Sequence, residues 1–373
     1  MLMRTPRTLD IEITARCNLR CRYCYADAGR KSVEMPWPLA KAAIDLVAEN
    51  AGRLGSPRFA VGFHGGGEPL LAWNLVVQSV EYARACAEEK GLTVEIFAAS
   101  NGFLSPEQRD YVASHFSSLN VSLDGPPDIQ DYNRPTLSGS GSYALVCETL
   151  KDFDRRGFPY GVRATITASS VARMVDIVEH LTSEFRPTYV HLEPVWQCGR
   201  CLTTGELPAD ESDFIEHFRS AAQRGRELGA NVTYSGARLG MLVSKFCAAP
   251  GDGFSVLPEG IATSCFEVTE LSDPRAQIFH YGHYDPSAGA FVFDHERLAA
   301  LRTLSVENLS FCQDCFCRWH CAGDCLAKVF ERSGSAEHQG SPRCGLNRAL
   351  TLASLRDLVR AEMVVGATSE VVL

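Results

Sequence analysis

Apolar and polar residues alternate along the first two-thirds of the chain with two different periods. Runs of period two predict strands, and longer stretches with apolar positions three or four residues apart predict helices. Six units in which a strand precedes a helix indicate parallel strands with crossover helices, in an open sheet or a barrel. The predicted strands are 8–13, 59–63, 93–97, 119–123, 161–167 and 189–193. The predicted helices are 39–51, 73–90, 106–115, 142–156, 171–185 and 211–228.

This pattern ends near residue 235. Glycine, proline, cysteine and short irregular pieces then dominate to about residue 346, before a closing helix predicted over 348–364. Such a stretch cannot bury much apolar surface by itself, so we expect metal centres to hold it together. The predicted division is a core domain over 1–235, a cysteine-rich domain over 236–346, and a C-terminal helix and tail over 347–373.

Composition and charge narrow the class of protein. The 373 residues are 45% hydrophobic and 22% charged, as in an ordinary globular protein. A net charge of −9 argues against a sequence-independent nucleic-acid surface. No apolar run is long enough for a bilayer, and no signal-peptide core is present, so we expect no membrane partner and a cytoplasmic location. Fifteen cysteines then favour metal binding or thiol chemistry over disulfides.

Three cysteines follow the first predicted strand closely. Cys17, Cys21 and Cys24 have the spacing C-x3-C-x2-C. Three thiolates are one fewer than a cubane [4Fe–4S] cluster normally takes, so one iron would keep an open position for a cofactor or substrate. A zinc loop, which would need a fourth ligand, and three unrelated buried thiols are the alternatives. The carboxyl end of a parallel strand is also where such folds bind ligands.

This loop resembles the signature of the radical S-adenosylmethionine (SAM) enzymes, in which an aromatic residue precedes the third cysteine, as Tyr23 does here. The resemblance implies an α/β fold, a partial (β/α)6 barrel. It also implies that the open iron binds the amino and carboxylate groups of SAM. Reduction then cleaves SAM to methionine and a 5′-deoxyadenosyl radical, which abstracts a hydrogen atom from the substrate.

Four further motifs end predicted strands in the order of the SAM-binding places of that family, and the first two are also ordinary turn sequences. They are Gly65-Gly66-Gly67-Glu68-Pro69, which resembles the GGEP motif, then Ser100-Asn101-Gly102, Ser122-Leu123-Asp124-Gly125 and Leu192-Glu193-Pro194-Val195. The SAM contacts implied by the resemblance are Tyr23, Gly66, Gly67, Glu68, Ser100, Asn101, Ser122, Asp124 and Glu193. Arg134 and Arg163 are candidates for the SAM carboxylate, because guanidinium binds carboxylate in a bidentate fork; each alone is also a common surface arginine.

Seven later cysteines and one glycine form a second framework, with a zinc ribbon as the alternative. The order is Cys247, Gly260, Cys265, Cys312, Cys315, Cys321, Cys325 and Cys344. It resembles the SPASM domain, which carries two auxiliary [4Fe–4S] clusters and would bring the total to three. The resemblance assigns one cluster to Cys312, Cys315, Cys321 and Cys344. It assigns the other to Cys247, Cys265 and Cys325, with either an open iron or a fourth ligand such as Cys198 or Cys201.

Other chemistry-bearing residues are less well defined. Cys317 is an extra thiol within the framework and is expected to be a spectator, whereas Cys86 and Cys147 lie in predicted helices and are expected in the core. Glu267 is a weak candidate for a catalytic base. It lies one position away from the base of sulfatase maturases, and a solvated carboxylate is the alternative.

The leading functional hypothesis is a radical SAM peptide maturase that forms an oxidised product, such as a C–C, C–O or thioether crosslink. Expected partners are a peptide substrate and an electron donor such as flavodoxin or ferredoxin. Because Cys17 lies near the first residue, we expect no leader-binding domain before it and consider a separate leader-binding protein. Alternatives are an anaerobic sulfatase maturase, a small-molecule dehydrogenase, an epimerase, and a non-enzymatic iron–sulfur carrier or zinc scaffold.

Overall fold

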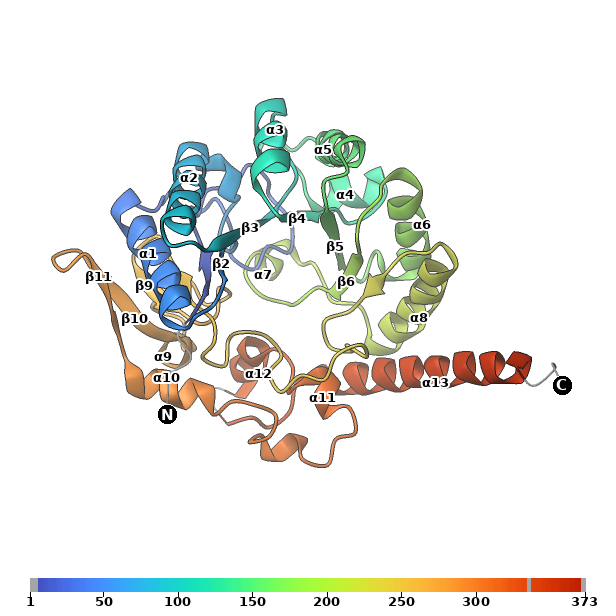
Figure 1. Cartoon of the computed structure of the whole chain (residues 1–373). Coiled ribbons are helices and arrows are strands. Elements are labelled where there is room, and N and C mark those ends of the chain that lie inside the picture. The colour runs from blue at the N-terminus through green and yellow to red at the C-terminus, as the bar shows by residue number, and fades with distance from the viewer. Residues whose placement is uncertain (1–5, 334–336, 370–373) are drawn as a thin grey trace.

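Six parallel strands form the centre of the fold in chain order (Figure 1). The computed structural model describes residues 6–333 and 337–369. All six predicted strands are present, with ends displaced by at most three residues. They are β1 Thr8–Ile11, β2 Arg58–Phe63, β3 Thr93–Ser100, β4 Ser118–Ser122, β5 Tyr160–Ile166 and β6 Val190–Pro194.

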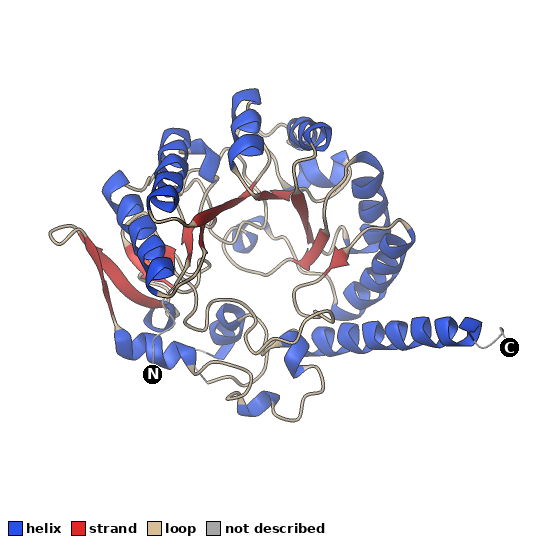
Figure 2. Cartoon of the chain, viewed as in Figure 1, coloured by secondary structure: helices blue, strands red, loops and turns tan. Residues whose placement is uncertain are grey.

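Helices cover the outer side of these curved strands, as Figure 2 shows. The six predicted helices are confirmed, the fifth of them with a short 3-10 turn at Val171–Arg173 as its beginning. Two helices of this part of the chain were missed, α4 Pro127–Asn133 and α7 Cys201–Thr204, because they are too short to show a period. The confirmed helices are α1 Trp37–Arg53, α2 Trp73–Glu89, α3 Pro106–His115, α5 Tyr143–Arg156, α6 Met174–Glu184 and α8 Glu211–Glu227.

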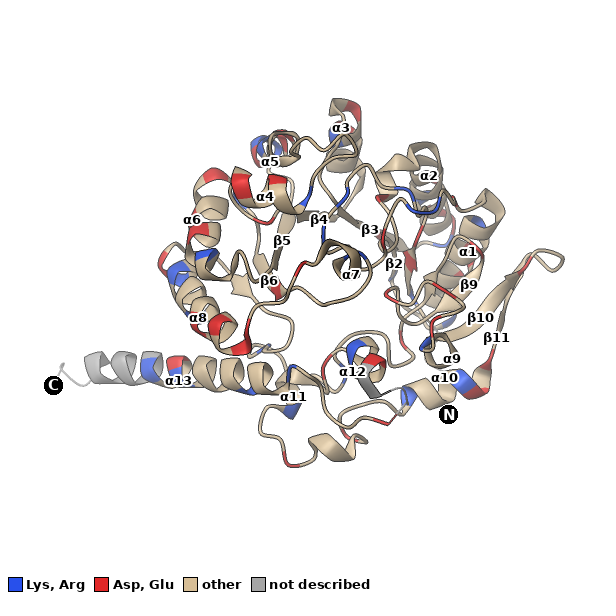
Figure 3. Ribbon diagram, turned by 180° about the vertical axis from the view of Figure 1, so that it is seen from behind, with Lys and Arg blue, Asp and Glu red and all other residues tan. Residues whose placement is uncertain are grey.

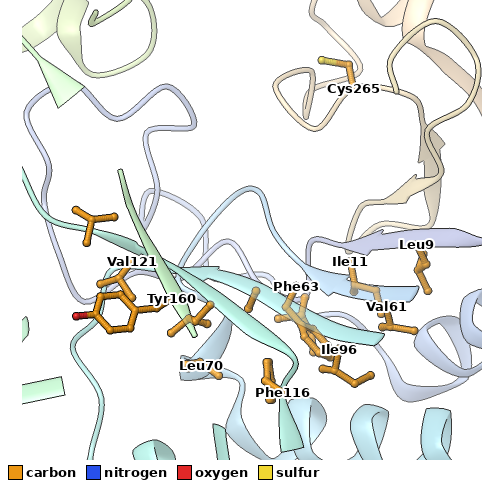
Figure 4. Packing of buried hydrophobic residues seen from close by; sticks show 14 of the residues in the cluster. Leu9, Ile11, Val61, Phe63, Leu70, Ile96, Phe116, Val121, Tyr160 and Cys265 are labelled. Carbon is orange, nitrogen blue, oxygen red and sulfur yellow. The ribbon is translucent and has the colours of Figure 1, made fainter. Parts of the chain in front are cut away.

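The main apolar core lies between the strands and these outer helices. Leu9, Ile11 and Val61 are fully buried in it, and Figure 4 shows them side by side on β1 and β2. Because successive side chains of a strand point to opposite faces, the residues between them face the inside of the arc. The alternation therefore places Asp10, and Glu12 just beyond β1, on the inner face.

The sheet continues past β1 into the C-terminal part of the chain. Strand β8 pairs parallel with β1, and three antiparallel strands follow it, while β7 extends the other end beside β6. The expectation that irregular pieces dominate after residue 235 is wrong for the hairpin of β10 and β11. Strands β8 and β9, and β7 just before that residue, are too short to predict. The division into domains stays a prediction. The strands are β7 Val232–Thr233, β8 Ser255–Val256, β9 Ile261–Thr263, β10 His280–Asp285 and β11 Ala290–Phe293.

Five helices complete the C-terminal part. The last, α13 Cys344–Ser369, is longer than the predicted 348–364, packs on α8 and projects away from the rest of the molecule (Figure 1). Within the described residues, no helix combines the length and apolar character needed to cross a membrane. The other helices lie in the stretch expected to be irregular and were not predicted. They are α9 Ala276–Phe279, α10 His295–Arg302, α11 Arg318–Cys321 and α12 Leu326–Ser333.

Charges of both signs share the outer helices. Figure 3 shows basic and acidic residues next to each other on α5 and α8. Arg224 of α8, for example, pairs with Glu179 of α6 at 2.6 Å. Pairs as exposed as this one contribute little stability, so they do not account for how the elements are held together.

A buried ion network joins β6 to the cysteine-rich segment. The Arg343 guanidinium lies 2.5 Å from Glu193 Oε1 and donates from Nε to Asp324 at 3.1 Å. Glu193 also accepts hydrogen bonds from Ser235 Oγ at 2.8 Å and from His191 Nε2 at 2.9 Å. Although burial opposes ionisation, Arg343 holds the pKa of Glu193 well below its ordinary value. One cation thus fixes the C-terminal segment against the end of the parallel sheet.

Replacing Arg343 with methionine should destabilise the protein strongly. The change leaves two buried carboxylates without their cation, which typically costs about 3–5 kcal/mol. Arg226→Met is the matched control, because Arg226 forms an exposed ion pair with Asp357 and should matter by less than about 1 kcal/mol. The measurement is the thermal midpoint of the anaerobically purified proteins. Equal midpoints for the two variants would contradict the role given to Arg343.

Candidate active site

The three-cysteine loop leaves the end of β1 and is bound to the glycine-rich segment after β2. Gly67 N donates to Thr14 O at 2.9 Å, and Glu68 N donates to Arg16 O at 2.8 Å. A Cβ atom on Gly67 would overlap the carbonyl group of Arg16. Only glycine therefore lets the two segments approach this closely.

Each of the three sulfur atoms in this loop accepts an N–H group. Leu19 N donates to Cys17, Ala28 N donates to Cys24, both at 3.4 Å, and Arg134 Nη1 lies 3.9 Å from Cys21 Sγ. Burial raises the pKa of Cys17 to about 11 and that of Cys21 to about 12. Metal ligation requires thiolates, so a bound metal would have to provide the compensating positive charge. The all-sulfur donor set with N–H support fits an iron–sulfur cluster.

Glu68 holds the Ser100-Asn101-Gly102 motif, at the end of β3, close to the cysteine loop. Its buried carboxylate accepts hydrogen bonds from Leu70 N at 3.2 Å, Ser100 Oγ at 3.0 Å and Asn101 N at 2.7 Å. Burial raises the pKa of Glu68 to about 7. Asn101 in turn donates to Asn18 Oδ1 at 2.7 Å, so the end of β3 touches the cysteine loop. The structure brings these motifs together, and their contacts with SAM stay predictions.

Asp124 anchors the loop from the end of β4. Its fully buried carboxylate accepts hydrogen bonds from Tyr23 Oη, from Asn133 Nδ2 and Arg134 Nη2 at 3.0 Å, and from Thr165 N at 2.9 Å. The aromatic residue of the cysteine motif is therefore tied to β4 and β5. Asp124 and Arg134 are paired with each other, and their contacts with SAM, like that of Glu193, stay predictions.

Ser122 and Arg163 lie opposite each other on β4 and β5. Arg163 is exposed, between the buried Val162 and Ala164, so the strand alternation places it on the inner face. Their proposed contacts with SAM are likewise untested.

Two polar residues of the inner face, Glu12 and His64, were not predicted from the sequence. The β1–β2 register pairs Ile11 with Phe63, so the next residue of each strand shares the inner face. Glu12 Oε2 and His64 Nδ1 are both buried and have no hydrogen-bond partner among the described residues. The alternation within 8–13 could have shown Glu12, but a polar face read from sequence does not distinguish an enclosed interior from solvent.

The surroundings of this pair are enclosed. Glu12 lies against Gly66, and the ring of Phe266 packs on that of His64 with 4.1 Å between centroids. Burial, followed by repulsion from Glu259 and Glu270, raises the pKa of Glu12 to about 8; Lys31 opposes the rise. Burial lowers the pKa of His64 to about 4. Near neutral pH the interior thus offers a neutral carboxylic acid as a donor and a neutral imidazole.

Glu267 is partly buried and faces a buried lysine. Its carboxylate lies 3.7 Å from Lys328 Nζ, and that ammonium is 5.9 Å from the ring centre of Trp196. Cys198 interacts electrostatically with both Glu267 and Lys328. The ion pair explains why Glu267 can be held inside the molecule, while its role as a base stays a prediction.

The later cysteines form two groups. Cys265 interacts electrostatically with Cys247 and Cys325, and Figure 4 shows Cys265 on a loop set apart from the apolar strand residues. No three Cys, His, Asp or Glu residues in the described chain are arranged to share a single metal ion. Zinc thiolates converge on one ion, whereas a cubane distributes its ligands over separate irons. The second group lines one cavity and consists of Cys312, Cys315, Cys317, Cys321 and Cys344.

The segment after β6 packs against the first cysteine loop and binds it by hydrogen bonds. A Cβ atom on Gly199, which has φ +54°, would overlap the carbonyl groups of Cys24 and Tyr25. Arg200 donates to Cys21 O at 2.9 Å, to Ala28 O at 2.7 Å and to Asp27 Oδ1 at 2.8 Å. Arg200 is thus a positioning residue that the sequence analysis did not identify.

Replacing Arg200 with methionine should loosen the cysteine loop. The variant loses the bonds to two carbonyl groups and one carboxylate, so iron bound by the loop should be released faster to a chelator. The measurement is the rate of iron release from anaerobically reconstituted protein. Arg224→Met, on the outer helix α8, is the control and should release iron at the parental rate. Equal rates for both variants would show that Arg200 does not hold the loop.

Replacing Glu12 with glutamine should change how stability depends on pH. In the unfolded chain Glu12 ionises near pH 4.5, and in the folded chain near pH 8. Between these values the folded state holds the extra proton, so raising the pH from 5 to 8 lowers the stability of the parent. Glutamine cannot ionise, and the thermal midpoint of the variant should rise relative to the parent over this range.

The control for that measurement is Glu49→Gln, at an exposed position of α1. Its midpoint should follow that of the parent at every pH. If the Glu12→Gln and parental profiles are parallel, Glu12 does not hold a proton that the unfolded chain releases.

The family model and the relatives that match this chain agree with each other. The model of the Radical SAM superfamily matches residues 11–180, which include the first cysteine loop and β2 to β5. The serine-type anaerobic sulfatase-maturating enzyme of Klebsiella aerogenes is 23% identical over 338 residues, 84% of this chain and 78% of the relative. Two other curated relatives are aligned over only 57% and 40% of their own length, so the chain spans about half of each.

Two solved structures share the fold over nearly the whole chain. The structure of anSMEcpe with bound AdoMet has a TM-score of 0.73 at 15% identity and covers 95% of this chain and 98% of its own. Streptococcus suis SuiB bound to its precursor peptide SuiA has a TM-score of 0.63 at 13% identity, with coverages of 91% and 76%. The fold is thus the α/β radical SAM fold with a parallel sheet and a C-terminal extension resembling that of anSMEcpe. The matched segment contains the three-cysteine loop and three of the four strand-end motifs, and residues 11–180 thus belong to the Radical SAM superfamily.

Proposed function

We propose that this enzyme modifies a residue of a ribosomally made peptide and leaves an oxidised product, such as a C–C, C–O or thioether crosslink. The main support for this proposal is that the thiols form three groups. One group lies in the loop after β1, and two lie in the C-terminal extension. A radical reaction that only moved one hydrogen atom would need no further redox centres. Additional clusters suit reactions in which the substrate loses a second electron.

Cys17, Cys21 and Cys24 would hold the first [4Fe–4S] cluster. When bound, this cluster supplies the electron that cleaves SAM to methionine and a 5′-deoxyadenosyl radical. The residues proposed for SAM binding are Tyr23, Gly66, Gly67, Glu68, Ser100, Asn101, Ser122, Asp124, Arg134, Arg163 and Glu193. Their hydrogen bonds to one another give this side of the site a fixed shape before a ligand arrives.

Residues 236–346 would form a SPASM domain with two auxiliary clusters. Cys312, Cys315, Cys321 and Cys344 would hold one, in the cavity that they line together. Cys247, Cys265 and Cys325 would hold the other, whose fourth position is open or taken by Cys198 or Cys201. Phe266 and Glu267 directly follow Cys265, so the group that contains Cys265 lies next to the inner face with its buried acid and imidazole.

The inner face is suited to a peptide because its free polar atoms match an amide. The neutral Glu12 carboxylic acid can donate to a peptide carbonyl group, and the neutral His64 imidazole can accept from a peptide N–H if Nδ1 is unprotonated. The Glu267–Lys328 pair adds a carboxylate that could remove a proton from the oxidised residue. Solved structures of anSMEcpe and SuiB contain bound peptides, which supports a peptide as the substrate class.

A second candidate is the oxidation of a sulfatase Cys or Ser to formylglycine. The similarity to anSMEcpe over 95% of this chain and to the Klebsiella aerogenes enzyme over 84% favours it. The position of Phe266 counts against it, because the carboxylate expected directly after the second framework cysteine is displaced to Glu267. The two candidates differ in substrate, not in the use of SAM.

Mass spectrometry of co-expressed peptides tests the proposal. The chain is produced anaerobically with each short open reading frame beside its gene, and with a sulfatase-derived peptide, in ordinary and in heavy water. A flanking peptide should lose two hydrogen atoms, and fragmentation should locate the new bond. Formylglycine in the sulfatase peptide alone would instead establish the second candidate.

Two cysteine variants make this test specific. Cys24→Ala removes one proposed ligand of the first cluster and should abolish the mass change. Cys147→Ala changes a buried cysteine of α5 outside both frameworks and should leave the mass change intact. An unchanged mass with deuterium gained only in heavy water would indicate epimerisation and would overturn the oxidative proposal.

A further inference from the structure

The cavity in the C-terminal extension contains one thiol more than a cubane cluster needs. Its walls include Phe311, His338 and Asn347, and all the framework thiols expected for one auxiliary cluster open into it. Cys317, which the sequence analysis treated as a spectator, lines the same cavity and is only 2% exposed. Five thiols therefore surround a site for which a cluster offers four iron positions.

The fifth thiol stands directly beside one predicted ligand. Cys315 Sγ and Cys317 Sγ are 3.4 Å apart, which is contact distance and far beyond a disulfide bond. The local backbone explains their approach. Cys315 N donates to Cys312 O at 3.1 Å in the turn before α11, and Cys317 O accepts from Cys321 N at 2.9 Å in that helix. The turn brings the two side chains to the same side of the chain.

The guanidinium of Arg348 interacts with the sulfur atoms of both Cys315 and Cys317. Arg348 of α13 donates a hydrogen bond to Cys315 and interacts electrostatically with Cys317, and it also lines the cavity. Two of the other predicted ligands have N–H partners of their own, because Asn347 Nδ2 lies 3.1 Å from Cys321 Sγ and Ser341 N lies 3.2 Å from Cys344 Sγ. Among the described cysteines of this cavity, Cys315 is the one with both a second thiol in contact and a hydrogen bond from Arg348, which also interacts electrostatically with Cys312 and Cys344.

We propose that Cys315 and Cys317 are interchangeable ligands of one iron in this auxiliary cluster, with Cys312, Cys321 and Cys344 holding the other three. This inference rests on the part of the proposed function that places a cluster in the cavity. In the exchange, the iron–sulfur bond of Cys315 breaks and that of Cys317 forms, while the Cys317 thiol gives its proton to the released Cys315. No electron is gained or lost. Arg348 can stabilise whichever of the two thiolates is bound.

Iron and sulfide analysis of cysteine variants tests this inference on the full chain. The variants are Cys315→Ala, Cys317→Ala and the double substitution, with Cys321→Ala as a variant that should lose the cluster and Cys147→Ala as the neutral control. Each is reconstituted anaerobically. Each single substitution should retain the parental iron content, whereas the double variant and Cys321→Ala, which leave ligands for only three irons, should each lose up to about four iron atoms per chain to a chelator.

Three patterns of iron content would overturn the inference. Loss of about four iron atoms in either single variant would show that the remaining thiol cannot replace its neighbour. Full retention in the double variant, with loss in Cys321→Ala, would show that neither thiol is a ligand. Full retention in both would show that the cavity holds no cluster, and the peptide mass change would then decide the proposed activity separately.

A second measurement guards against simple misfolding. The double substitution is also made with serine, which keeps a polar γ atom in place of sulfur, and the electron paramagnetic resonance spectrum is recorded with and without SAM. A response to SAM that is retained together with the iron loss would show that the first site is intact. Loss of both the response and the secondary structure by circular dichroism in the alanine and serine forms would overturn the assignment, because the pair would then be required for folding.

Discussion

Hydrogen bonds to two buried carboxylates, Glu68 and Asp124, are the constraint on which the site depends. The cysteine loop contains three thiols that must come close together in a poorly hydrated place, where free thiolates would be costly. Glu68 ties the loop's surroundings to the end of β3, and Asp124 ties Tyr23 to β4 and β5. Buried carboxylates are tolerated because backbone and side-chain donors surround them. The same bonds that satisfy the carboxylates therefore also fix the loop.

A second buried network extends this principle to the C-terminal extension. Arg343 stands between Glu193, at the end of β6, and Asp324, between two framework cysteines. Removal of any one member would leave uncompensated charge in a dry place, so the extension cannot shift without a large cost. The parallel sheet and the thiol groups thus behave as one unit. The interior they enclose is lined by Glu12, His64 and the Glu267–Lys328 pair.

Much of the fold could be predicted from the sequence, because six strands and six helices have strong periods and the motifs stand at strand ends. The roles of individual residues could not. Asp124 and Glu193 were expected to contact SAM. Within the chain, the Asp124 carboxylate accepts from Asn133, nine residues away in sequence, and the Glu193 carboxylate accepts from Arg343, 150 residues away. Long-range partners leave no local pattern. Glu12 was also missed. The alternation along a strand assigns residues to two faces, but it does not show whether the polar face is enclosed by the protein or open to solvent.

The central claim is that this loop, held by Glu68 and Asp124, supports reductive cleavage of SAM. The most direct measurement is the conversion of SAM by the anaerobically reconstituted chain after reduction with dithionite, followed by chromatography. The account predicts methionine and 5′-deoxyadenosine in equal amounts. Intact SAM in the presence of a reduced cluster, demonstrated by its electron paramagnetic resonance signal, would contradict it.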